Sequence, residues 1–222
     1  MCTTTPTHER EHGSFLAGPE KRALIWMAER LPSRINSDHL TLLGLASTLA
    51  AGLAYWTARS NELALVLVVP ALALNWFGDS LDGTLARVRN QQRPRYGYYV
   101  DHVIDILGAL FLLGGLALSG YMSPLVAMSL LVAYLMVSAE IYLATHARGL
   151  FKLSFMKFGP TELRIVLAAG TLYLLYRPRV ELLGATYNLF DIGGLVAIAG
   201  LAVALVVSAA RNTRALYLAE PI

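Results

Sequence analysis

Long apolar stretches alternate with short polar segments along the whole chain. A helix that crosses a bilayer needs about 20 mostly apolar residues, and six stretches reach or approach that length. They cover residues 40–58, 63–78, 99–118, 124–145, 161–176 and 192–210. The second and fifth stretches are short and must include flanking polar residues to span. The pattern therefore predicts an all-α, polytopic membrane protein with six transmembrane helices.

The chain before the first apolar stretch divides into two parts. Residues 1–18 are mostly polar and lack the apolar core of a signal peptide, so we expect a disordered lead. In residues 19–34, apolar positions recur at helical spacing, and Trp26 is a residue type common at membrane interfaces. We expect an N-terminal amphipathic helix lying in the inner interface, with an ordinary helix packed on the bundle as the alternative. Residues 35–222 then form one transmembrane domain.

The composition agrees with a lipid environment. Of the 222 residues, 56% are hydrophobic and 15% are charged, whereas a typical soluble domain has about 25% charged residues. The net charge of +3 is small, and the basic residues lie between apolar stretches rather than on soluble elements that could bind nucleic acid. The single cysteine, Cys2, excludes an internal disulfide, and no Cys/His set suggests zinc.

Basic residues are distributed unequally between the two sides of the predicted bundle. With the N-terminus inside, the inner segments hold most of the lysine and arginine, including four arginines within residues 87–95. The outer segments hold Arg59, Arg177 and Arg179. The positive-inside rule therefore predicts that both termini and the turn around residues 87–95 face the cytosol.

Four aspartates lie where the second and third apolar stretches are joined. On a helix, the first half of this segment places five residues on one face, at i, i+3, i+4, i+7 and i+8: Asp79, Asp82, Gly83, Ala86 and Arg87. The second half places three residues on one face, at i, i+4 and i+8: Gly97, Asp101 and Asp105. The segment between them contains Pro94 and is too polar to span, so we expect a turn that brings both faces together at the inner membrane boundary.

Four carboxylates at one place would repel one another strongly unless cations neutralise them. All-oxygen ligands favour Mg²⁺, Mn²⁺ or Ca²⁺, and four carboxylates suit two ions that clamp a phosphoryl group and its leaving oxygen. Gly83, Ala86 and Gly97 leave room for a base or a pyrophosphate, and Arg87 can meet phosphate oxygens. A single aspartate at a helix end usually caps the helix or faces water, but two such pairs with small residues beside them favour a functional site.

The order D-x2-D-G-x2-A-R followed by G-x3-D-x3-D resembles the signature of the CDP-alcohol phosphotransferase family, also called CDP-alcohol phosphatidyltransferases. All eight fixed positions are present. The resemblance implies a homodimer that depends on two divalent cations, Mg²⁺ or Mn²⁺, and releases CMP. It implies that the metal ligands are Asp79, Asp82 and Asp101, with Asp105 as the general base and a further metal contact. It implies that the CDP pocket is formed by Gly83, Ala86, Arg87 and Gly97.

The resemblance leaves two reactions in phospholipid synthesis open. In the preferred reaction, CDP-diacylglycerol gives its phosphatidyl group to the hydroxyl of a small polar alcohol. In the alternative, CDP-choline or CDP-ethanolamine donates its head group to a lipid alcohol. A cation transporter with intramembrane acids is a more distant alternative, because its acids would lie near the bilayer midplane rather than beside an arginine-rich turn.

A second group of candidates lies around the junction of the fourth and fifth stretches. Glu140 lies within an apolar stretch, where an acid is either functional or paired with a residue such as His146. Residues 159–162, Gly-Pro-Thr-Glu, open a helix and also resemble a segment of the aminoalcohol branch of the family. A cationic acceptor would use Glu140 or Glu162. A phosphorylated acceptor would instead use basic residues, whose placement the positive-inside bias also explains: Arg148, Lys152, Lys157 and Arg164.

Overall fold

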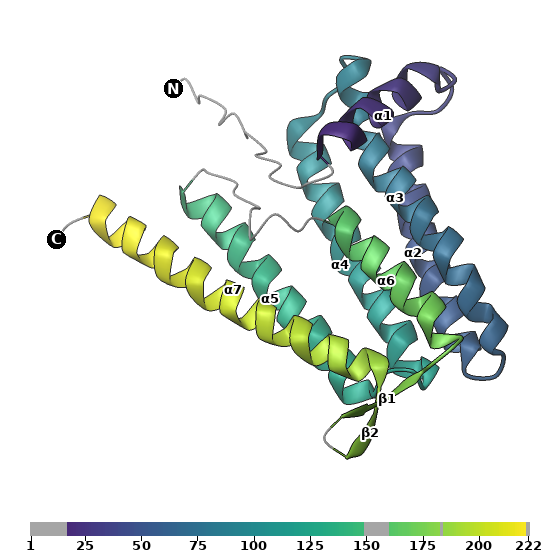
Figure 1. Cartoon of the computed structure of the whole chain (residues 1–222). Coiled ribbons are helices and arrows are strands. Elements are labelled where there is room, and N and C mark those ends of the chain that lie inside the picture. Colours follow the sequence, from purple (N-terminus) through teal and green to yellow (C-terminus); the bar gives the residue numbers. More distant parts are fainter. Residues whose placement is uncertain (1–16, 149–159, 183, 221–222) are drawn as a thin grey trace.

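The computed structural model describes residues 17–148, 160–182 and 184–220. Its helices are α1 (Ala17–Arg30), α2 (Ser37–Ala58), α3 (Leu65–Val88), α4 (Pro94–Ser119), α5 (Pro124–Arg148), α6 (Pro160–Leu174) and α7 (Leu189–Ala219). A short 3-10 helix, η1 (Glu62–Ala64), precedes α3. The helices run back and forth between two ends, and α1 lies across one of them (Figure 1). The prediction of an all-α protein is confirmed.

Five helical segments in the described residues are long and apolar enough to cross a membrane. They are α2, η1 together with α3, α4, α5 and α7. Helix α6 has 15 residues, which corresponds to about 22 Å at 1.5 Å per residue, against a hydrocarbon core of roughly 30 Å. The residues before α6 lie outside the described part of the chain, so the sixth span stays a prediction.

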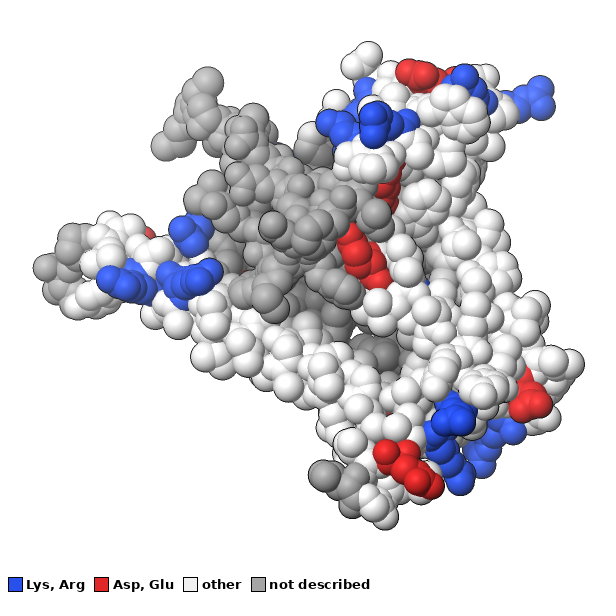
Figure 2. All heavy atoms as spheres, in the orientation of Figure 1, with Lys and Arg blue, Asp and Glu red and all other residues white. Residues whose placement is uncertain are grey.

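The outer surfaces of these helices suit contact with lipid. Leu125 on α5 is 78% exposed and Val203 on α7 is 64% exposed. Figure 2 shows the lysine and arginine side chains of the described residues gathered toward the ends of the molecule. Apolar exposure on this scale marks a membrane or partner surface rather than a surface in water. Together with the candidate spans, it identifies an integral membrane protein.

Helix α2 packs closely against both α3 and α4 because glycines line the contacts. A Cβ added at Gly78 would lie 2.5 Å from the carbonyl oxygen of Leu40 and 2.7 Å from the backbone nitrogen of Gly44. A Cβ added at Gly115 would lie 2.1 Å from the carbonyl oxygen of Gly52. Small residues let helix backbones approach in this way within membranes. As a result, α3 and α4 are both fixed against α2, and these two helices carry the aspartates.

Helix α1 is amphipathic and packs on the end of the bundle. Leu24 and Ala28 are buried in a cluster with Leu81 of α3, while Trp26 is 57% exposed. The helix thus combines a packed apolar face with an aromatic residue directed outward. The division into a disordered lead, an interfacial helix and a transmembrane domain stays a prediction, since residues 1–16 lie outside the described part.

A hairpin that the sequence analysis did not predict joins α6 to α7. Strand β1 (Arg179–Leu182) pairs antiparallel with β2 (Ala185–Asn188). Gly184 in the connection has φ of 81°, a conformation that glycine adopts without strain. The hairpin lies at the end of the bundle opposite α1 (Figure 1).

Candidate active site

The two helical faces that carry the aspartates converge. Helix α3 continues through the first half of the motif, residues 89–93 reverse the chain, and α4 begins at Pro94. Proline suits the first turn of a helix because its missing N–H has no partner there anyway. Ligand oxygens from Asp79, Asp101 and Asp105 all lie within 4.8 Å of one another. The turn therefore brings carboxylates from two helices to one place.

Asp82 lies beside this group, and its neighbours fix the direction of its carboxylate. One oxygen accepts a hydrogen bond of 2.7 Å from the Thr41 hydroxyl on α2, and the other accepts from the backbone nitrogen of Gly83. Asp82 follows Asp79 by three residues on α3, so the two carboxylates share one helical face. All four aspartates of the motif therefore belong to one site, and Thr41 of α2 orients the Asp82 carboxylate.

The donor set at this site fits hard divalent cations. Every ligand atom that the aspartates offer is a carboxylate oxygen, the type that Mg²⁺ and Mn²⁺ prefer. Asp79 and Asp101 are only partly exposed. Acidic groups in such surroundings need positive partners, because their mutual repulsion is poorly screened there.

One positive partner comes from α6. Arg164 donates from a terminal nitrogen to Asp79 Oδ2 at 2.5 Å and from Nε to Asn75 Oδ1 at 2.7 Å. Asn75 in turn donates to the carbonyl oxygen of Gly44 at 3.0 Å and to the hydroxyl of Thr48 at 2.7 Å, both on α2. Asn75 therefore links three helices directly beside the aspartates.

The small residues of the motif border open space rather than another helix. A Cβ added at Gly83 would meet a terminal nitrogen of Arg87 at 3.5 Å, which is ordinary van der Waals contact. A Cβ added at Gly97 would meet nothing within 4 Å among the residues that the structure describes. Arg87 is exposed and donates to the hydroxyl of Thr84 at 3.0 Å. These glycines thus differ from Gly78, whose hydrogen faces the backbone of α2.

A cavity of about 400 Å³ opens beside the motif, between the start of α2 and the turn after α3. It is lined by Asn36, Ser37, Asp38, Leu85, Ala86, Gln91, Gln92 and Arg93. Its volume lies in the range of small-molecule sites, and its amides and hydroxyl provide directional donors and acceptors. Ala86, a motif position, therefore borders a space that could hold part of a ligand.

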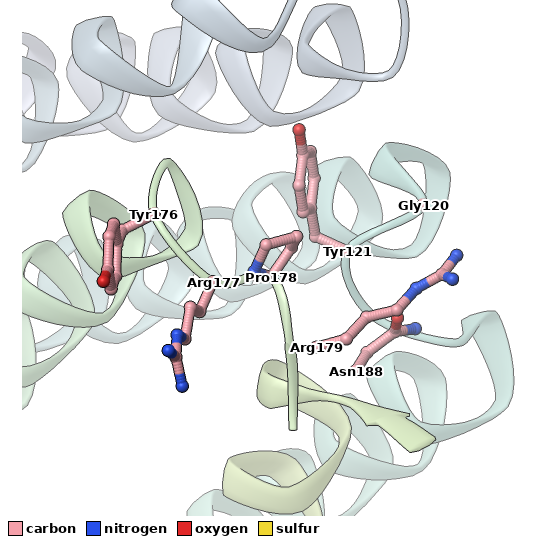
Figure 3. A pocket seen from close by; sticks show the side chains of 7 residues that line it. All are labelled: Gly120, Tyr121, Tyr176, Arg177, Pro178, Arg179 and Asn188. Carbon is pink, nitrogen blue, oxygen red and sulfur yellow. The ribbon is translucent and has the colours of Figure 1, made fainter. Parts of the chain in front are cut away.

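A second cavity, of about 460 Å³, lies at the hairpin end. It is lined by Gly120, Tyr121, Tyr176, Arg177, Pro178, Arg179 and Asn188. Figure 3 shows that the side chains of Arg177 and Arg179 point in different directions. None of the described residues that line this cavity is acidic, so they do not offer the carboxylate ligands of the first site.

Helices α4 and α5 place aromatic residues beside Asp105. The rings of Tyr98 and His102 have centroids 4.1 Å apart, and His102 meets Tyr142 edge-on at 4.8 Å. Tyr134 and Tyr142 of α5 lie within electrostatic range of Asp105. The sequence analysis did not single out these residues, although the tyrosines of α5 are eight residues apart and so share a helical face.

The predicted acceptor residues separate in the structure. Arg164 reaches the aspartates, whereas Glu140 accepts hydrogen bonds of 2.7 Å from both Ser208 and Asn212 of α7 rather than pairing with His146. Arg148 donates to the side chain of the same Asn212 at 2.5 Å. Glu140 and Arg148 therefore connect α5 to α7.

The remaining acceptor candidates lie around the start of α6. Glu162 is in the first turn of this helix, which begins at Pro160 as predicted. Lys152 and Lys157 lie outside the described residues.

Two further residues hold the site and were missed from the sequence. Asn75 could have been recognised, since it is a polar residue in an apolar stretch and precedes Asp79 by one helical turn. Thr41 lies 41 residues before Asp82, and no local pattern marks such a contact.

Comparisons with known proteins agree with this geometry. A family model described as CDP-alcohol phosphatidyltransferase matches residues 35–210. A comparison with curated individual proteins finds no match. The matched range runs from just before α2 into α7 and includes all four aspartates of the motif. Because this match covers most of the chain, the protein belongs to the CDP-alcohol phosphatidyltransferase family.

Proposed function

We propose that this protein transfers a phosphatidyl group from CDP-diacylglycerol to the hydroxyl of a small polar alcohol and releases CMP. Family membership supports the general reaction, transfer from a CDP-alcohol to an alcohol. The observation that carries the proposal is the convergence of Asp79, Asp101 and Asp105 at the end of two transmembrane helices. An integral membrane protein with such a site suits a reaction in which one substrate is a lipid.

Asp79, Asp82, Asp101 and Asp105 would hold two divalent cations, Mg²⁺ or Mn²⁺. When bound, these cations supply positive charge to the transferred phosphate and to the leaving oxygen. The chain contributes the positions of the ligands, because close packing of α3 and α4 against α2 fixes the carboxylates. The hydrogen bond from Thr41 orients Asp82 before any substrate arrives, which lowers the reorganisation that binding requires.

The donor's nucleotide would lie along the motif face of α3. Gly83 and Gly97 border open space, so a pyrophosphate can approach the backbone there. The cavity beside Ala86 would receive the base or ribose, with amide side chains for hydrogen bonds. Arg87, exposed on the same face, would pair with phosphate oxygens.

Asp105 would act as the general base. The acceptor oxygen forms the new bond to phosphorus, the bond from that phosphorus to the oxygen of CMP breaks, and the acceptor proton passes to the carboxylate. A positioned base contributes about 10²–10⁴-fold to such a step. Tyr142 of α5 packs edge-on against His102, which directly follows Asp101, and its hydroxyl suits a polyol acceptor.

Orientation and assembly complete the proposal. The aspartate site lies at the end of the bundle that carries α1 and the arginine-rich turn, and the positive-inside rule supports a cytosolic location for that end. The family resemblance further implies a homodimer.

The test is CMP release by purified protein in lipid nanodiscs with Mg²⁺. In separate reactions, CDP-diacylglycerol is offered with free polyols, phosphorylated polyols, serine and ethanolamine. In further reactions, CDP-choline or CDP-ethanolamine is offered with diacylglycerol. The proposal expects acceptor-dependent CMP release with a polyol or a phosphorylated polyol. Release only from CDP-choline or CDP-ethanolamine with diacylglycerol would show the alternative reaction. Absence of CMP with every pair would overturn the proposal.

A further inference from the structure

The aspartate site already contains a positive charge that belongs to the protein. The Arg164 guanidinium pairs with Asp79 at 2.5 Å, and the two side chains are only 18% and 30% exposed. Salt screens a pair this far from bulk water less than it screens a surface pair. The guanidinium and the Asp79 carboxylate therefore form an ion pair that salt weakens little.

Asn75 holds Arg164 independently of Asp79. The amide nitrogen of Asn75 donates two hydrogen bonds to α2, one to the carbonyl oxygen of Gly44 and one to the hydroxyl of Thr48. The amide oxygen is consequently fixed toward α6, where it accepts from Nε of Arg164. If the contact with Asp79 breaks, the guanidinium stays anchored at its Nε edge.

The helix that carries Arg164 is itself anchored near this point. Thr161, one turn earlier on α6, donates to Glu20 Oε1 of α1 at 2.8 Å. The same oxygen accepts from the indole nitrogen of Trp76 on α3 at 2.7 Å. Two contacts therefore position Arg164: the Thr161–Glu20 hydrogen bond anchors its helix, and the hydrogen bond to Asn75 anchors its side chain.

We propose that Arg164 is a resident cation of the aspartate site, which neutralises Asp79 until a divalent cation displaces its terminal nitrogen. This inference rests on the proposed function, in which Asp79 is a metal ligand. Asn75 keeps the displaced guanidinium at the edge of the site, where its terminal nitrogen can turn to a phosphate oxygen. Two consequences follow: the protein folds without metal, and its affinity for the first cation is lower than the carboxylates alone would give.

The test is a titration of Mn²⁺ into metal-depleted protein in nanodiscs, followed by electron paramagnetic resonance. Arg164→Ala should bind the first Mn²⁺ about tenfold more tightly than the wild type, because a charged hydrogen bond no longer competes. Arg214→Ala removes one exposed charge from α7 and is the matched control, which should bind as the wild type does. Arg164→Lys keeps the charge but lacks the Nε donor to Asn75, so its affinity should fall between the two.

The outcomes separate this inference from the proposed function. If the wild type does not bind Mn²⁺, or if Asp79→Asn leaves binding unchanged, the proposed metal site itself is wrong. If Asp79→Asn weakens binding while Arg164→Ala binds equally or more weakly, the metal site stands and the resident cation is wrong. If Arg164→Lys binds Mn²⁺ with the same affinity as the wild type, the hydrogen bond from Arg164 Nε to Asn75 does not keep the guanidinium in the site. The lysine variant alone tests the proposal if the alanine variant does not fold.

Discussion

Two glycines on α3, five residues apart, should respond in opposite ways to the same substitution. At Gly78, a new Cβ would lie 2.5 Å from the carbonyl oxygen of Leu40. Backbone atoms cannot rotate away, so α2 and α3 must separate. Overpacking of this kind costs about 1–3 kcal/mol, which exceeds the gain of up to about 1 kcal/mol for alanine in a helix. At Gly83, the nearest atom is the flexible end of Arg87 at 3.5 Å, so only the gain remains.

The assay measures thermal unfolding in detergent for both alanine variants and donor affinity for Gly83→Leu at saturating Mg²⁺. Gly78→Ala should unfold at a lower temperature than the wild type, and Gly83→Ala at the same or a higher temperature. Gly83→Leu should fold but lose CDP-donor binding, because its side chain fills the space beside the aspartates. Retained donor affinity in folded Gly83→Leu would remove Gly83 from the pocket. Equal destabilisation by the two alanines would show that Gly83 serves helix packing.

Three further predictions test contacts away from the aspartates. Glu140→Gln should lower the unfolding temperature and leave the KM for the acceptor unchanged, because the Glu140 carboxylate joins α5 to α7. A selective rise in the acceptor KM would show instead that Glu140 contributes to the acceptor site. Glu20→Ala leaves two half-buried donors, on Trp76 and Thr161, without their acceptor and should destabilise the protein by about 0.5–1.5 kcal/mol in detergent unfolding. The exposed Glu29→Ala on the same helix should be neutral. In a cysteine-free background, an impermeant thiol reagent applied to intact cells should label Thr186→Cys and not Gln92→Cys; the reverse pattern would invert the proposed orientation.

The helices follow from the sequence because long apolar stretches determine them locally. The predicted stretch 99–118 corresponds to α4, Pro94–Ser119. The helix begins five residues earlier than the apolar stretch, at Pro94, and its first turn is polar. The hairpin at 179–188 was missed because its strands have four residues each and the connection between the fifth and sixth stretches gave no period to recognise.

The aspartate motif was predictable for a related reason. Asp79 and Asp82 share one helical face and Asp101 and Asp105 another, so spacing alone places them in pairs. The partner of Arg164 was not predictable, because Arg164 and Asp79 are 85 residues apart and meet only when α6 packs against α3. The pattern placed Arg164 among acceptor residues, whereas the folded chain pairs it with Asp79. Glu140 illustrates the same point, since its partners on α7 lie 68 and 72 residues away.

The central claim is that the converged carboxylates perform the transfer, and CMP release by single aspartate variants tests it most directly. Turnover and donor KM are measured at saturating Mg²⁺ for Asp79→Asn and Asp105→Asn, with Glu181→Gln, an exposed carboxylate of the hairpin, as the control. The account predicts that Asp79→Asn loses donor binding and turnover together. It predicts that Asp105→Asn keeps a near-normal donor KM but loses about 10²–10⁴-fold in turnover, while Glu181→Gln is unaffected. Near-normal CMP release from Asp79→Asn would contradict the account.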